Sequence, residues 1–323
     1  MRVLFIFKLF ELRTLIKRKI IIGTRGSKLA LWQAEWVKSY LVQKFTDLSV
    51  ELKIIKTKGD RILDVALAKV GGKGLFVKEI EQSLADSSID IAVHSMKDMP
   101  ADLHDGLCIG AIPERENPRD VLISGKGLLL SQLPEGALVG TSSLRRIAQI
   151  KRIRPDLVIA PLRGNLDTRI NKLEMGEIDA IILAAAGVKR LGLEKIITEY
   201  LNEDTMLPAV GQGALCIEIR KDDHDISGFI NEMNHFVTRA VVLGERAFLK
   251  RIEGGCQVPI AGYGKVENDI FIIRGLVADP DGKTIITDTQ RGSLESSESI
   301  GAALADRLIS MGAKRLLDNL NVL

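Results

Sequence analysis

The sequence holds few of the residues that build metal centres, disulfide frameworks or aromatic stacking surfaces. Its three cysteines are an odd number and form no Cys-x-x-Cys pair, which argues against a disulfide framework or a zinc site and indicates a reducing compartment. The four histidines show no metal-ligand spacing. Aromatic residues make up only 4%, which leaves few surfaces for stacking nucleic-acid bases. We therefore expect a cytoplasmic protein with no structural metal and no nucleic-acid partner.

Long apolar runs are also missing. Residues 3–7 are apolar, but Lys8, Glu11 and Arg13 interrupt the run well before the roughly 18 residues that a membrane span requires. The segment lacks the small-residue cleavage site of a signal peptide and the serine enrichment of a transit peptide. We interpret residues 1–18 as a dispensable extension and expect no membrane contact, with a weak amphipathic surface anchor as the alternative.

The composition is otherwise that of a globular protein. The chain has 323 residues, of which 46% are hydrophobic and 27% charged, and this length suffices for two or three domains. The net charge of +3 is small, but the basic residues are unevenly spread. This pattern predicts anionic ligands at particular sites and not a general polyanion-binding surface.

The globular part is predicted to begin with a strand, a polar turn and a helix. Residues 19–23 form the strand, and Arg25 and Ser27 follow it. A turn between strand and helix is an anion site, because the free amides of the first helical turn point into it. Helical periodicity places on one face Leu29, Trp32, Trp36 and Tyr40, with Gln33, Val37 and Leu41 beside them.

We place the chemistry in the stretch 89–100. Its first residues indicate a buried parallel strand, which becomes polar from His94 onward and stops at Pro100. In open α/β sheets, ligands bind at the carboxyl ends of the strands, so Lys97 and Asp98 are expected to face a crevice. The alternative is that Asp98 is a solvated turn carboxylate that accepts hydrogen bonds from nearby backbone amides.

Three later strand ends are each followed by arginine. The strands are predicted at 137–140, 157–160 and 179–186. The candidate anion-binding residues after them are, in order, Thr141, Ser143, Arg145 and Arg146, then Arg163 and Arg169, then Arg190. Guanidinium groups bind carboxylates or phosphates at two points, so several converging on one crevice imply a ligand with several such groups. The alternative is a solvated basic helix or an RNA-binding patch over residues 145–154.

Two stretches, 112–119 and 207–213, are predicted crossings between domains, and Gln212 lies in the second. Two crossings of one hinge are expected when one domain is inserted into another. The glycine cluster at 71–74 lacks the spacing of a nucleotide-binding loop. We interpret it as part of a mobile lid with Lys69, Lys73 and Phe76, and a plain flexible loop is the alternative.

A small C-terminal unit is predicted after a helical stretch at 222–251. It contains strands at 270–278 and 284–290, a turn at 279–282 and a closing helix at 297–312. Cys108 and Cys216 lie in apolar runs and are expected in the core. Cys256 lies in a glycine-flanked loop at the entrance to this unit, so it is either an accessible, reactive thiol or an inert surface cysteine.

Six segments together resemble one family, hydroxymethylbilane synthase, also called porphobilinogen deaminase. They are AVHSMKDMP, VGGKGLFVKE, VGTSSLRR, LRGN with Arg169 close behind, LPAVGQGA and EGGCQVPI. The resemblance implies an α/β fold with two periplasmic-binding-protein-like (type II) domains around a hinged cleft, plus a small C-terminal α+β domain. The domain limits that we expect are 19–116 with 214–234, then 117–213 as the inserted domain, then 235–323.

The resemblance also implies the chemistry. Four porphobilinogen molecules are condensed head to tail, each losing ammonia, onto a dipyrromethane cofactor held by a thioether on Cys256, and hydroxymethylbilane is released by hydrolysis. Asp98 matches the family's catalytic aspartate, and Lys97 is expected to hold a cofactor carboxylate. The residues expected to bind cofactor or substrate are Arg25, Ser27, Thr141, Ser143, Arg145, Arg146, Arg163, Arg169, Arg190 and Gln212. The family is usually monomeric.

Two other classes of function stay open at this point. A non-catalytic carboxylate-binding protein of solute-binding type would suit the fold and the arginines, but it would leave the Gly-Gly-Cys loop unexplained. An RNA-binding module using residues 145–154 is disfavoured by the missing recognition motif and the scarce aromatic residues.

Overall fold

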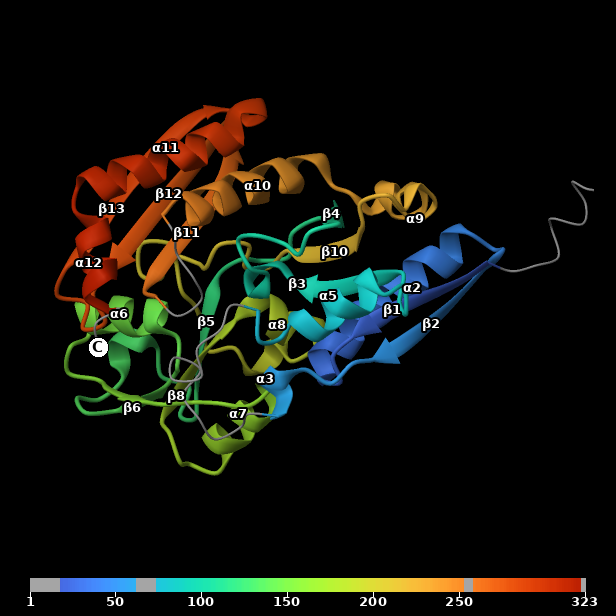
Figure 1. Cartoon of the computed structure of the whole chain (residues 1–323). Helices are drawn as coiled ribbons and strands as arrows, with labels where there is room; N and C mark the ends of the chain where they lie inside the picture. Colours follow the sequence, from blue (N-terminus) through green and yellow to red (C-terminus); the bar gives the residue numbers. More distant parts are fainter. Residues whose placement is uncertain (1–17, 62–73, 253–257, 321–323) are drawn as a thin grey trace, which may run out of the picture.

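The computed structural model describes residues 18–61, 74–252 and 258–320. Within these ranges the chain forms three sheets, each covered by its own helices (Figure 1). Lys69, Lys73 and Cys256 lie outside the described residues, as does the N-terminal stretch 1–17.

The first sheet is built from two separate stretches of the chain. Across the sheet, its strands are β2 (Leu48–Ile54), β1 (Arg18–Thr24), β3 (Ile91–Ser95), β10 (Leu215–Arg220) and β4 (Leu107–Ala111). β1 pairs parallel with both β2 and β3, whereas β10 runs antiparallel between β3 and β4. The predicted strands at 19–23 and 89–93 are therefore confirmed, although β3 is parallel to only one of its neighbours. Its helices are α2 (Lys28–Lys44), α3 (Lys58–Arg61), α5 (Lys78–Ala85) and α9 (His224–Ile230).

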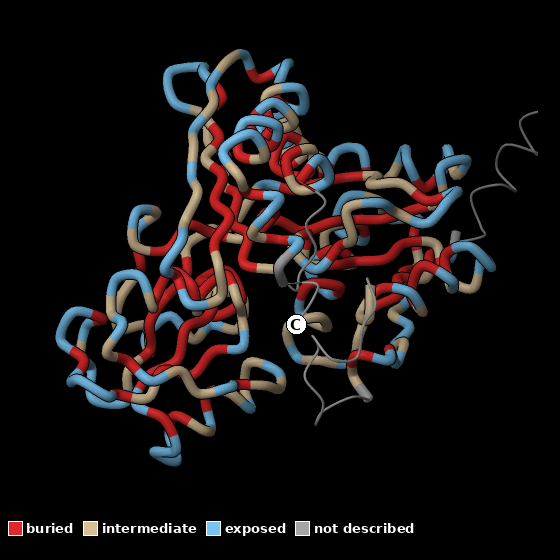
Figure 2. Tube along the Cα trace, turned by 60° about the vertical axis from the view of Figure 1, so that its left-hand side comes forward, coloured by how far each residue is buried: buried red, intermediate tan, exposed pale blue. Residues whose placement is uncertain are grey.

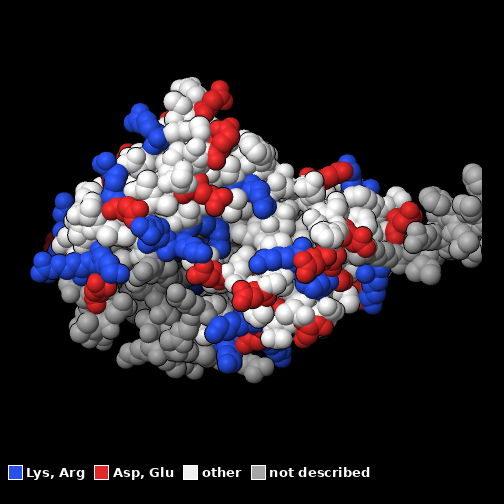
Figure 3. Space-filling model, turned by 45° about the horizontal axis from the view of Figure 1, so that its top comes forward, with Lys and Arg blue, Asp and Glu red and all other residues white. Residues whose placement is uncertain are grey.

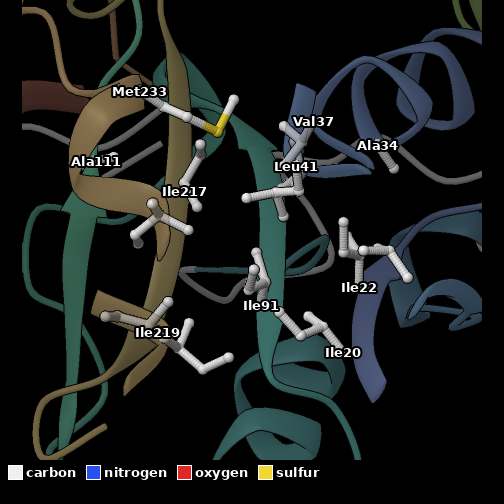
Figure 4. Packing of buried hydrophobic residues seen from close by; sticks show 14 of the residues in the cluster. Ile20, Ile22, Ala34, Val37, Leu41, Ile91, Ala111, Ile217, Ile219 and Met233 are labelled. Atoms are coloured by element: carbon white, nitrogen blue, oxygen red, sulfur yellow. The ribbon is translucent and has the colours of Figure 1, made fainter. Parts of the chain in front are cut away.

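Branched aliphatic side chains from β1, β3 and β10 form the first core together with apolar residues of α2 and α9 (Figure 4). α2 begins at Lys28 because the Ser27 hydroxyl accepts a hydrogen bond from the Ala30 amide at 3.3 Å. Trp32 and Trp36, on the first of the two predicted stripes, have rings that are 38% and 39% exposed. The buried stripe is Ala34, Val37 and Leu41. Periodicity alone does not choose between two neighbouring apolar stripes, and in the structure the stripe with Val37 and Leu41 lies in the core.

The second sheet repeats the pattern of the first. Its strand order is β7 (Val158–Ala160), β6 (Leu138–Gly140), β8 (Ala180–Ala184), β5 (Asp120–Ser124) and β9 (Glu199–Tyr200). β6 pairs parallel with β7 and β8, and β5 runs antiparallel to β8. The three predicted strands are confirmed, whereas the short strands β5 and β9 were not predicted. Its helices are α6 (Leu144–Ile153), α7 (Leu166–Glu174) and α8 (Ala185–Arg190).

The third sheet is antiparallel and lies against two long helices. It consists of β11 (Ile260–Glu267), β12 (Ile270–Ala278) and β13 (Ile285–Ser293), with α10 (Phe236–Arg251), α11 (Ser297–Ser310) and α12 (Ala313–Leu320). The predicted strands at 270–278 and 284–290 and the closing helix are confirmed, and β11 and α12 were not predicted. Figure 2 shows buried residues along the inner strands of the molecule. The strand orders of the three sheets confirm the predicted fold class: two type II α/β units and a small α+β unit.

The stretch 222–251 is helical as predicted, but it is divided into two helices, α9 and α10. α9 packs on the first core through Ile226 and Ile230, whereas α10 packs on the third sheet. The chain turns between them because His235 caps α10: its Nδ1 accepts a hydrogen bond from the Thr238 amide at 3.3 Å. Apolar residues continue through both helices, so the sequence pattern did not show the change of partner.

The chain passes between the first two sheets twice, at 112–119 and 201–214, which we call the hinge crossings. We propose that the domains are 19–116 with 214–234, the inserted 117–213, and 235–323. Among the described residues, no helix combines the length and the apolarity needed to cross a bilayer.

The turn between β12 and β13 packs against α6 of the second sheet. Gly282 has φ +68°, and a Cβ there would lie 2.1 Å from the carbonyl oxygen of Ala148. Ala148 also belongs to an apolar cluster with Ala261 and Leu276 of the third sheet. The third sheet therefore supports the helix whose first turn carries Arg145 and Arg146.

Gly282→Ala should destabilise the fold more than Gly127→Ala. Both glycines have φ +68°, but nothing lies within 4 Å of a Cβ at Gly127. The left-handed backbone alone costs about 1–2 kcal/mol in each variant, and the contact with Ala148 should add roughly 1–3 kcal/mol in Gly282→Ala. Urea unfolding of the three proteins measures this difference. Equal losses in the two variants would contradict close packing of the turn on α6.

Candidate functional site

The candidate site lies where the carboxyl-end edges of the first two sheets meet the hinge crossings. β1 and β3 are parallel and end at one edge, so Arg25, Ser27, Lys97 and Asp98 all emerge there. β6, β7 and β8 are also parallel, and their ends carry the predicted arginines of the second sheet. Such edges are where open α/β sheets bind ligands.

Electrostatic interactions show that residues from the two sheets come together. Burial lowers the pKa of Lys97 to about 8, and this ammonium interacts with Asp98 beside it and with Arg146 and Arg145 of the second sheet. Its side chain keeps a partly exposed surface, but the protein surrounding it removes most of its hydration. Burial likewise lowers the pKa of Arg169 to about 10, with Arg146 adding to the shift and Asp98 opposing it. Lys97, Asp98, Arg146 and Arg169 therefore form one cluster.

Asp98 lies on a short 3-10 turn, Met96–Asp98, at the end of β3. The Met96 amide donates to the carbonyl of Ala214 at 3.0 Å, and Met96 and Met99 are buried on either side of the turn. These anchors leave the Asp98 side chain exposed. Asp98 is solvated, as the alternative expects, but among the described residues no backbone amide donates to its carboxylate.

A small pocket lies beside Asp98. Its polar lining consists of Arg25, Ser27, Gln33, His94, Ser95 and Asp98. The Gln33 amide nitrogen donates to the Ser95 hydroxyl at 3.0 Å. Gln33 was not predicted as a site residue; its signal in the sequence is a glutamine beside Val37 and Leu41 on one helix face.

Arg25 is held in place by two partners. Its guanidinium lies 4.2 Å from the centre of the Phe76 ring, and its Nε donates to Asp60 at 3.1 Å. Burial alone would raise the pKa of Asp60, but hydrogen bonds from Arg25 and Thr57 outweigh burial and hold it below its ordinary value. Asp60 therefore stays ionised and fixes the guanidinium at the rim of the pocket.

Arg145 and Arg146 share a buried carboxylate, Asp120. Arg145 Nη1 donates to Asp120 Oδ2 at 2.7 Å, and Arg146 Nη2 donates to Oδ1 at 2.7 Å. Asp120 is 0% exposed and both arginines are 5% exposed. Burial alone would raise the pKa of Asp120, but the two guanidinium groups keep it far below its ordinary value. Asp120 was not predicted as a site residue; its only signal in the sequence is an acidic residue at the start of an apolar run.

The remaining predicted residues lie around this cluster. Thr141 is buried, and its hydroxyl accepts from the Ser143 amide at 3.2 Å at the start of α6. Arg190 donates to the carbonyl of Gly213 at 2.7 Å, and burial lowers its pKa to about 10. Gln212 lies in the second hinge crossing, and Arg163 lies partly exposed after β7.

The charges of the site suit a ligand that carries several carboxylates. Burial removes water from Lys97, Arg169 and Arg190, and an anionic ligand would restore the interactions that these cations lose. On the face shown in Figure 3, by contrast, basic and acidic side chains are interspersed. A larger, open pocket lies at the opposite edge of the first sheet. Its lining includes Asp105, Asp222, Asp223 and Asp225, which do not suit an anion.

Comparison with known proteins gives two matching family models. The model described as "Porphobilinogen deaminase, dipyromethane cofactor binding domain" matches residues 20–228, and the one described as "Porphobilinogen deaminase, C-terminal domain" matches residues 240–310. Among solved structures, the substrate binding protein of an amino acid ABC transporter aligns with a TM-score of 0.37 at 14% identity, covering 67% of this chain and 91% of that one.

Curated relatives match over nearly their full length. The porphobilinogen deaminase of Carboxydothermus hydrogenoformans is 52% identical over 94% of this chain and 98% of its own. That of Bacillus pumilus is 55% identical over 93% of this chain and 97% of its own. This chain therefore belongs to the porphobilinogen deaminase family.

Proposed function

We propose that this chain performs its family's reaction, the head-to-tail condensation of four porphobilinogen molecules with loss of ammonia and release of hydroxymethylbilane. The observation that carries the proposal is an exposed carboxylate, Asp98, surrounded by the poorly hydrated cations Lys97, Arg146 and Arg169. A solute-binding protein would need the cations, but it would have no use for an exposed carboxylate among them.

The cations would bind the acidic side chains of the pyrroles. Each porphobilinogen carries an acetate and a propionate, so a growing chain brings many carboxylates into the cleft. Arg146 and Arg169 on one side and Lys97 on the other would hold these groups through charge-assisted hydrogen bonds. Arg25, fixed by Asp60 and Phe76 at the pocket beside Asp98, would orient the incoming substrate.

Asp98 would act on the reacting ring. Loss of ammonia from porphobilinogen leaves a methylene-pyrroleninium cation, which a pyrrole α-carbon then attacks. The Asp98 carboxylate would accept a hydrogen bond from the pyrrole N–H, stabilise the developing positive charge and assist proton transfer. It can do so because the anchored methionines on either side hold its turn rigidly while its side chain stays exposed.

The covalent dipyrromethane would supply the free pyrrole α-carbon on which the chain is built. Its carboxylates fit the cations of the site, and we propose Cys256 as its attachment point through a thioether. We further propose that the chain acts as a cytoplasmic monomer with porphobilinogen as its small-molecule substrate.

Intact-mass spectrometry of the purified chain tests the cofactor and the activity together. We expect a mass increase equal to one dipyrromethane, together with release of ammonia when porphobilinogen is added. Cys256→Ala should lose both, because no thiolate is then available to form the thioether. Cys108→Ala, at a half-buried cysteine packed against the first core, should keep both. An unmodified mass in a chain that turns over porphobilinogen would overturn the cofactor assignment.

Affinity for porphobilinogen should fall as the pH rises through about 8, where Lys97 loses its proton. Below this pH the ammonium is charged and attracts a carboxylate; above it the amine is neutral. Lys97→Arg should flatten the dependence, because a guanidinium stays charged over the whole range. Measurement of KM on either side of pH 8 checks this. If KM rises equally with pH in the parent protein and in Lys97→Arg, a group other than Lys97 causes the pH dependence.

A further inference from the structure

Asp120 lies where the first hinge crossing enters the second sheet, and it determines how Arg145 is oriented. Arg145 Nη1 donates to Asp120 Oδ2 and to the Leu207 carbonyl, both at 2.7 Å. Its Nη2 donates to Asp120 Oδ1 at 3.2 Å and to Gln212 Oε1 at 3.4 Å. Each Nη carries two hydrogens, so protein acceptors engage both terminal nitrogens of this guanidinium fully.

Arg146 is engaged less completely. Its Nε and Nη2 donate to Asp120 Oδ1 at 3.0 and 2.7 Å, and its Nη1 donates to the Ile182 carbonyl at 2.8 Å. One hydrogen on each terminal nitrogen is left over from these bonds. Arg146 also interacts with Lys97 and Arg169. Arg146 therefore keeps two terminal N–H groups that can donate to a ligand, whereas the bonds of Arg145 leave over only its Nε–H.

The charges of this group do not balance. One carboxylate faces two guanidinium groups, and all three side chains are buried. If this group served stability alone, its buried positive and negative charges would be equal in number, because an uncompensated buried charge costs several kcal/mol. The surplus positive charge is accounted for if a ligand carboxylate completes the group.

Asp120 is also tied to both hinge crossings. Gln212, in the second crossing, donates through Nε2 to Asp120 Oδ1 at 3.1 Å and to the Pro118 carbonyl of the first crossing at 2.6 Å. Its own carbonyl accepts from Arg115 Nε at 2.7 Å. A rotation of one sheet against the other must therefore strain the contacts that orient the arginine pair.

We propose that Asp120 is a positioning residue: an internal carboxylate that occupies part of the Arg145–Arg146 pair, orients both guanidinium groups and leaves the pair one positive charge for one ligand carboxylate. The identity of that ligand as a carboxylated pyrrole rests on the proposed function. The orienting role of Asp120 does not.

Two variants test the role. Asp120→Asn removes the charge and keeps the size, and Asp120→Ala leaves room for formate as an external carboxylate. The matched control is Asp90→Ala, since Asp90 forms an ion pair of 3.2 Å with Arg220 at the opposite edge of the first sheet. Each protein is purified as the full chain, and its melting temperature is measured with sodium formate and with sodium chloride at equal ionic strength.

We expect Asp120→Ala to melt about 5 °C or more below the parent protein in chloride. Formate should recover at least about half of that loss, because it can take the place of the missing carboxylate between the two arginines. Formate should not raise the melting temperature of Asp90→Ala relative to chloride. Equal effects of formate on the two variants would overturn the proposal. If Asp120→Ala does not fold, the KM of Asp120→Asn for porphobilinogen tests the proposal instead.

Kinetics separates positioning from plain stability. Intact-mass spectrometry first gives the fraction of chains that carry the cofactor, and kcat is calculated per cofactor-bearing chain. Asp120→Asn should raise KM for porphobilinogen about tenfold and change this kcat by less than about threefold. An unchanged KM would overturn the proposal. If the parent protein carries no adduct and releases no ammonia, the proposed function fails, whereas the formate measurement still decides the role of Asp120.

Discussion

Asp98→Asn should lower kcat by about 10²–10³ and leave the cofactor adduct in place. Loss of one preorganised electrostatic stabiliser costs about 2.7–4 kcal/mol of barrier. The asparagine keeps the shape of the side chain, but it cannot balance the cation that forms when ammonia leaves. The turn itself should not change, since it is held by buried Met96 and Met99 and by the hydrogen bond from the Met96 amide to Ala214.

Single-turnover kinetics on adduct-bearing protein checks this expectation. Asp105→Asn is the control, because Asp105 is exposed and lines the acidic pocket at the other edge of the first sheet. It should behave like the parent protein. Turnover at the parent rate in Asp98→Asn would show that another group stabilises the cation.

Glu245→Ala should cost about 3–5 kcal/mol of stability, because it leaves a buried guanidinium without its partner. Glu245 is 0% exposed and lies on α10. Its carboxylate accepts hydrogen bonds from Arg115 Nη1 at 2.6 Å, from the Gly211 amide at 2.7 Å and from the Gly264 amide at 2.7 Å. These partners belong to the first hinge crossing, the second hinge crossing and β11, so one side chain joins three parts of the molecule.

Urea unfolding compares Glu245→Ala with Glu267→Ala. Glu267 also lies on the third sheet, but it is exposed and pairs with Lys265 at the surface. Exposed pairs contribute about 0–1 kcal/mol, so this control should unfold almost like the parent protein. A similar small loss in both variants would mean that the two hinge crossings hold together without Glu245.

The sequence alone located the turn that carries Asp98. An apolar run that becomes polar within two residues and stops at Pro100 indicates a strand end at a ligand site. The same reasoning predicted the strand ends that precede Arg145, Arg163 and Arg190, because short parallel strands leave a strong local pattern. The six matching segments then identified the family, which the curated relatives confirm.

The partners of the arginines could not be predicted in this way. Asp60 lies far along the chain from Arg25, and Asp120 lies in the unpredicted strand β5, well before Arg145. A hydrogen bond between residues remote in sequence leaves no periodic signal. The sequence also left open which of two apolar stripes of α2 faces the sheet, and the buried one contains Val37 and Leu41.

The sequence by itself determined the strand ends, the placement of Asp98 after one of them and the accumulation of positive charge, because each depends on residues that are neighbours in the chain. Only the tertiary structure decided which of those charges are already compensated. Asp60 and Asp120 reach Arg25, Arg145 and Arg146 through folding and desolvation, and burial, a property of the whole assembly of sheets, sets the pKa of Lys97 to about 8.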